Sequence, residues 1–166
     1  MMYPTLSSKV HQGLYQKLCD QLQSGPVVLA TVILTQGAVP CPVGTKMLIW
    51  GDAETFHGLS DDKAEQTVIQ QAFEVLKTGI AQRIKLDCDE QSRLGAMQVW
   101  LTRWQGSDAI ATAQQLLNSL SAPPSCPPHR LVIPLVTGQA PYLLSPAKPS
   151  LRNLQGGDAF IEELVA

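Results

Sequence analysis

Residues 27–34 read VVLATVIL, and together with the two segments that follow they give the strongest indication of the fold. An apolar run of this length, rich in β-branched residues, predicts a strand that is buried on both faces. The next segment, residues 36–45, reads QGAVPCPVGT. Its glycines and prolines do not fit a regular element, so we predict a loop. Residues 46–50 then predict a second strand, and the loop joins the two.

Helices flank this pair of strands in the sequence. Residues 8–24 predict a helix, because Val10, Leu14, Leu18 and Leu22 form one apolar stripe. A second helix is predicted from Asp62 to a stop at Gly79, with Asp62 and Glu65 in a capping-box pattern. The remaining predicted elements are a short strand that includes Thr55 and Phe56, strands at 80–86, 97–104, 131–136 and 142–144, a helix capped by Ser107, and a short terminal helix at 158–165.

The order of these elements, α-β-β-α-β-β-α-β-β, predicts an α/β fold in which helices pack on a mixed β-sheet. The length of 166 residues suits a single domain over 1–166. The proline-rich residues 121–128 are expected to form an extended linker. Alternation in residues 80–86 places that strand near a sheet edge, and Pro134 predicts an edge or a bulge for its own strand.

Composition limits the classes of function. The net charge is −2 and the pI is about 5.9, so nucleic acid binding, which depends on Lys and Arg, is not expected. The sequence shows neither a membrane-length apolar run nor a signal-peptide pattern, so we expect a cytoplasmic protein. Only 16% of residues are charged, which favours a surface partly covered by a partner or a second copy. Trp100 and Trp104, on the opposite side of their strand from Met97 and Val99, also require cover.

Metal and dinucleotide sites are not expected from the sequence. The four cysteines, Cys19, Cys41, Cys88 and Cys126, lie far apart and form no Cys-x-x-Cys pair. We therefore expect free thiols and no metal ion held by the protein. A Gly-x-Gly-x-x-Gly motif is also missing, so NAD is not an expected cofactor.

The loop at residues 36–45 is the best candidate for a ligand site. Its prolines and glycines hold an irregular backbone whose amides are able to face a ligand, and Lys46 adds a positive charge beside it. A purely structural crossover between two strands remains the competing interpretation. Cys41 would be a reactive thiol only if a nearby cation lowered its pKa. Asp61, Asp62 and Glu65 form an acidic group that could be interpreted as paired carboxylates for acid–base chemistry, but helix capping explains Asp62 and Glu65 without any chemistry.

The sequence LATV at 29–32, followed by Gly37, Pro40, Pro42, Gly44 and Lys46, resembles the opening motif of the XdhC/CoxI family. That resemblance covers residues 10–104 and implies a maturation factor for xanthine dehydrogenase or carbon monoxide dehydrogenase that binds molybdenum cofactor (molybdopterin). Where the family has a basic residue between the prolines, this chain has Cys41. Glycine-rich motifs of the family fall on residues 60–65 and 93–95, where only Glu65 and Gly95 agree. The Rossmann half of the family is not recognisable.

These observations define the predicted function. The resemblance implies a non-catalytic accessory protein, with a molybdoenzyme such as a xanthine dehydrogenase-like protein as partner. The alternative is a protein-interaction or regulatory homodimer without cofactor, and an unrecognised small-molecule enzyme is the third possibility. The cofactor-binding residues implied by the resemblance are Gly37, Pro40, Cys41, Pro42, Gly44, Lys46, Glu65 and Gly95.

Overall fold

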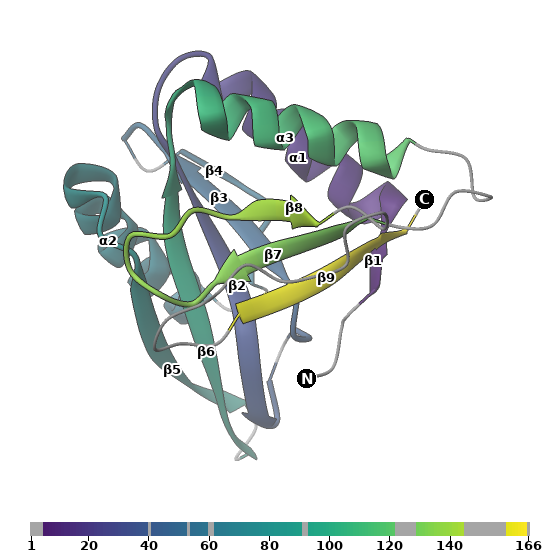
Figure 1. The fold of residues 1–166 in the computed structure, drawn as a ribbon. Helices are drawn as coiled ribbons and strands as arrows, with labels where there is room; N and C mark the ends of the chain where they lie inside the picture. The colour runs from purple at the N-terminus through teal and green to yellow at the C-terminus, as the bar shows by residue number, and fades with distance from the viewer. Residues whose placement is uncertain are drawn as a thin grey trace. The chain divides into compact units, whose positions relative to one another are not determined.

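The computed structural model describes residues 5–39, 41–52, 54–59, 62–90, 93–121, 129–144 and 159–165. Within it the chain forms two compact units. One consists of Gly25–Trp104, and the other combines Met1–Ser24 with Gln105–Ala166. Figure 1 shows the elements of both units. The expectation of a single domain over 1–166 stays a prediction.

The unit Gly25–Trp104 is built on a five-stranded antiparallel sheet of order β4-β3-β2-β6-β5. Its strands are β2 (Val27–Gly37), β3 (Lys46–Trp50), β4 (Glu54–Phe56), β5 (Gln82–Glu90) and β6 (Arg93–Trp104), and its helix is α2 (Asp62–Thr78). The strand predicted at 80–86 is indeed at the sheet edge, as β5.

One face of this sheet carries the core of the unit. Side chains from all of its long strands meet the buried face of α2, which consists of Ala64, Val68, Ala72 and Val75. Strand β2 lies in the centre of the sheet, and its first six residues are all buried, as the apolar run predicts. Because successive side chains of a strand point to opposite faces, this burial pattern means that both faces of β2 are covered.

The second unit contains a four-stranded sheet of order β1-β9-β7-β8 and two helices. Strand β1 pairs parallel to β9, and the other pairs are antiparallel. The elements are β1 (Thr5–Ser7), α1 (Ser8–Leu22), α3 (Gly106–Leu120), β7 (Arg130–Pro134), β8 (Tyr142–Leu144) and β9 (Ala159–Val165). The α/β fold class is therefore confirmed, with the strands divided between two sheets, of which this one is mixed.

The terminal helix predicted at 158–165 is wrong, because residues 159–165 form strand β9. Strand β9 pairs with β7 on one side and β1 on the other, and these hydrogen bonds override local helix preference. The prediction for Pro134 is also wrong, since β7 lies between β9 and β8. Pro134 is the last residue of β7, beyond the stretch that pairs with β8, so the sheet tolerates its missing N–H there.

Two boundaries also differ from the predictions. The polar segment 87–93, which lies outside the predicted strands, is largely strand in the structure. Asp87 pairs with Ala96 and Glu90 pairs with Arg93, so β5 extends to Glu90 and β6 begins at Arg93. Helix α3 begins at Gly106 with Gln105 as its N-cap, and no side-chain capping hydrogen bond is made, so Ser107 is not the cap. In the helices that the structure describes, none is both long and apolar enough to cross a membrane.

Glu65 links the first turn of α2 to the segment before it through a side-chain hydrogen bond. Its Oε1 accepts a hydrogen bond of 2.8 Å from the backbone N–H of Leu59, a fully buried residue. Gly58 lies against the same carboxylate, and a Cβ at Gly58 would collide with Oε1. The carboxylate thus satisfies a backbone donor that has little access to water.

We predict that Glu65→Ala lowers the free energy of unfolding by about 1–3 kcal/mol, because the buried N–H of Leu59 loses its acceptor. Glu65→Gln keeps an acceptor oxygen and should lose less. Urea unfolding measures both changes, with Glu74→Ala on the exposed face of α2 as the control. Equal stability of Glu65→Ala and Glu74→Ala would contradict the fastening role.

A second prediction concerns pH and the other unit. Burial raises the pKa of Tyr15 on α1, and the negative charge of Glu162 on β9 raises it further. The unfolded chain therefore releases this proton at lower pH than the folded chain, so stability is present below about pH 10 and falls above it. Tyr15→Phe should make this alkaline loss of stability less steep in urea unfolding between about pH 8 and pH 11. An unchanged slope would show that Tyr15 does not set it.

Candidate functional site

The loop between β2 and β3 uses its own polar backbone to hold its shape. The N–H of Gly44 donates to the carbonyl of Val32 at 2.8 Å, and the N–H of Val32 donates to the carbonyl of Thr45 at 2.9 Å. Thr45 also donates to the carbonyl of Pro42, through its N–H at 3.2 Å and through Oγ1 at 2.7 Å. These described amides therefore serve the fold, as the structural interpretation of the loop expects.

Lys46 is buried, with only 2% of its surface exposed. Its Nζ donates to the carbonyl of Gly44 at 3.2 Å, so the ammonium group supports the loop from within. Gly44 has a φ of 97°, a backbone conformation that glycine adopts without strain. Gly44 and Lys46 thus form one local arrangement that shapes the end of the loop.

Cys41 is also internal. It is 6% exposed and belongs to the same apolar core cluster as Met47 and Cys88. A thiol in such surroundings is typical of a structural cysteine. Pro42 is exposed, and Pro40 lies outside the described residues. Of the predicted cofactor-binding residues in and beside the loop whose placement is described, only Pro42 presents an exposed side chain, since Cys41 and Lys46 are buried and the glycines have none.

Gly37 and Gly95 are the two predicted site residues that the structure brings together. They are register partners on β2 and β6. A Cβ at Gly95 would collide with the carbonyl oxygen of Ala38, and one at Gly37 would collide with that of Leu94. Gly37 also has a φ of 68°. Close contact between the two backbones therefore explains both glycines, because any larger residue would push the strands apart.

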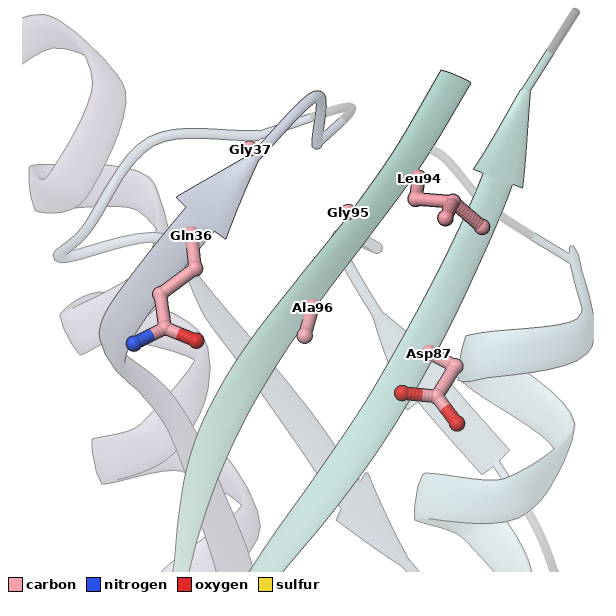
Figure 2. A pocket seen from close by; sticks show the side chains of 6 residues that line it. All are labelled: Gln36, Gly37, Asp87, Leu94, Gly95 and Ala96. Carbon is pink, nitrogen blue, oxygen red and sulfur yellow. The ribbon is translucent and has the colours of Figure 1, made fainter. Parts of the chain in front are cut away.

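A hollow of about 470 Å³ lies beside this glycine pair. It is lined by Gln36, Gly37, Asp87, Leu94, Gly95 and Ala96. Figure 2 shows how Gln36 on β2, Ala96 on β6 and Asp87 on β5 lie across three neighbouring strands. Ala96 is the register partner of both Gln36 and Asp87, so a small residue sits between two longer polar side chains. The hollow results from this difference in side-chain size.

The hollow lies on the sheet face opposite the core of its unit. Residues next to its lining, Cys88 and Met97, belong to the core cluster, and side chains alternate between faces along a strand. Among the lining residues that the structure describes, Asp87 is the one with an ionisable side chain. Gln36 can donate and accept hydrogen bonds, and exposed Leu94 adds an apolar rim. This arrangement suits a polar, uncharged or cationic group better than an anion.

The sequence interpretation missed Gln36, Asp87, Leu94 and Ala96. These four residues come from three strands, so they can be recognised as one group only when the strand pairing is known. Glu65, by contrast, is absent from this lining and holds Leu59. Trp100 and Trp104 are buried, and the Met97 and Val99 side of β6 does face the core.

A second hollow, of about 420 Å³, lies in the other unit. Its lining is mainly polar and consists of Gln115, Asn118, Ser119, His129 and Leu143. None of the predicted site residues contributes to it.

Ionisable groups elsewhere form no metal centre among the residues that the structure describes. The described cysteines, Cys19, Cys41 and Cys88, are free thiols. Burial, with a smaller contribution from the charge of Asp20, raises the pKa of Cys19 and disfavours its thiolate. Cys126 lies outside the described residues.

Comparison with known proteins now adds to this geometry. Residues 21–87 match the model of the XdhC and CoxI family. This segment contains β2, β3, β4 and α2 complete, together with most of β5. No protein in the curated set matches the sequence.

A solved structure shares the fold. It is the crystal structure of a protein from Bacillus halodurans described as a xanthine dehydrogenase, with a TM-score of 0.67 and 15% sequence identity. The match covers 91% of this chain and 52% of that protein, so this chain spans about half the length of its structural relative. At this identity the similarity shows the fold alone. The family match confirms the predicted resemblance to the XdhC and CoxI family over residues 21–87.

Proposed function

We propose that this chain is a non-catalytic accessory protein that assists the maturation of a molybdoenzyme, such as a xanthine dehydrogenase-like protein. The family match over residues 21–87 is the observation that carries the proposal. That segment forms most of one compact unit and includes the loop on which the family resemblance was recognised. The Bacillus halodurans protein, which is described as a xanthine dehydrogenase, shares the fold.

The geometry favours protein contact as the way in which the chain assists. Molybdenum cofactor carries a phosphate, and an anion of that kind is best held by exposed amides and cations. The N–H of Gly44 donates to Val32 on β2, the N–H of Thr45 donates to Pro42, and the Lys46 ammonium donates to the carbonyl of Gly44. The described residues of the predicted site therefore do not fit the phosphate end of the cofactor.

Delivery of molybdenum cofactor is the second candidate function, and the hollow beside Gly37 and Gly95 favours it. Its volume of about 470 Å³ falls within the range of small-molecule sites, roughly 300–1,000 Å³. Gln36 offers hydrogen-bonding groups to a polar ring. Asp87 opposes this assignment, because its carboxylate would repel an anionic ligand.

One experiment separates the two functions. The protein is purified from a host that makes molybdenum cofactor, and the sample is oxidised to convert bound cofactor into a fluorescent pterin. For an accessory protein that acts by protein contact, we predict no stoichiometric pterin, even after loading with intact cofactor. Pterin at about one equivalent would establish delivery instead.

Variants then locate any cofactor that is found. Ala96→Leu fills the hollow between Gln36 and Asp87 and should abolish a pterin signal that arises there. Ala111→Leu, on the exposed side of α3, is the matched control and should leave the signal unchanged. The maturation role itself is tested by capture of cofactor-free xanthine dehydrogenase on the immobilised protein. Failure of both capture and cofactor binding would overturn the proposed function.

A further inference from the structure

Strand β5 presents an open edge. It is the outer strand of the five-stranded sheet, and in the part of the chain that the structure describes no strand pairs with its far side. Figure 1 shows it at the border of its sheet. An edge strand offers a row of backbone N–H and C=O groups that can pair with another strand. With residues Gln82–Glu90, β5 is long enough to form an extensive ladder.

The two sides of β5 differ sharply in chemistry. Leu86 and Cys88 are buried in the core cluster, and Ile84 packs against it. Arg83, Lys85 and Asp87 alternate with these residues and are exposed. Exposed charges on an edge strand discourage pairing with an arbitrary apolar strand. The order of the charges therefore decides which strand is an acceptable partner.

The order of charges along β5 is complementary to that of a second copy of the strand running in the opposite direction. The basic residues Arg83 and Lys85 occupy the first half of the strand, and the acidic residue Asp87 lies in the second half. Leu86 is the midpoint of Gln82–Glu90. A second β5 aligned antiparallel about Leu86 overlaps along its full length and sets Lys85 opposite Asp87. A parallel alignment would set like charges opposite each other, which is unfavourable.

We propose that β5 is a homodimer interface, at which two copies of this chain pair their β5 strands antiparallel around Leu86. Antiparallel pairing of identical strands generates a two-fold axis, the commonest symmetry of protein dimers. Antiparallel pairing also joins the sheets of the two copies into one sheet, with their equivalent faces on the same side. Both α2 helices therefore lie on the same face of the joined sheet. The interface does not depend on the proposed maturation role, and Asp87 is the residue that it shares with the hollow beside the glycine pair.

The test uses one charge reversal in each half of the strand. In Lys85→Glu the new carboxylate faces Asp87 of the second copy, and in Asp87→Lys the new ammonium faces Lys85. Each variant alone should dimerise about tenfold more weakly than the original chain, because opposite charges become like charges at two symmetric positions. An equimolar mixture of the two variants restores opposite charges at both positions and should form a heterodimer. Sedimentation velocity at several concentrations measures all of these states.

Lys63→Glu and Asp52→Lys are the matched controls, because they make the same charge changes at exposed positions away from β5. Both should dimerise like the original chain, and added salt should weaken the original dimer. A monomeric original chain would overturn the proposal, as would undiminished dimerisation of Lys85→Glu or Asp87→Lys. A mixture that stays monomeric would overturn the antiparallel register. Folding of each variant is checked by circular dichroism, and recovery in the mixture excludes misfolding as the cause.

Discussion

The pairing of β2 with β6 is the constraint on which the unit Gly25–Trp104 depends. It extends from Val27 opposite Trp104 to Gly37 opposite Gly95, across a register shift between Val32 and Leu34. At its far end two glycines face each other because neighbouring carbonyl oxygens occupy the space that side chains would need. This pairing positions the loop that follows β2, the hollow beside the glycine pair and, through β6, the outer strand β5.

The polar groups near this pairing serve the protein's own backbone. Gly44 and Thr45 bond to Val32, the Lys46 ammonium bonds to Gly44, and the Glu65 carboxylate bonds to Leu59. Buried backbone groups need such partners, since an unsatisfied one costs free energy. The loop between β2 and β3 has the composition of a ligand-binding loop, but these hydrogen bonds hold it in place as a connection between two strands. In the part of this unit that the structure describes, the hollow around Ala96 and the outer edge of β5 are not covered by another strand.

The local sequence pattern predicted an element correctly where the buried residues of that element follow a regular pattern along the chain. The apolar run at 27–34 became the central strand β2, and the stripe of α2 packs on the core as its helical spacing indicates. Local pattern failed where distant pairing decided the outcome. Residues 159–165 form a strand because β1 and β7 flank them, and neither neighbour is visible in the local sequence. The predicted ligand residues were similarly ambiguous, since a glycine or lysine in a loop serves binding and support equally well.

The α/β class, the position of the buried strand and its loop, and the resemblance to the XdhC and CoxI family could be predicted from the residues alone, because periodicity and motif spacing are local properties. The burial of Lys46 and Cys41, and the alignment of Gln36, Ala96 and Asp87 in one row, became clear from the three-dimensional structure. The structure also showed that the charges of β5 line an open edge. The physical reason is that burial and strand register arise from contacts between residues far apart in the chain, and composition does not record them.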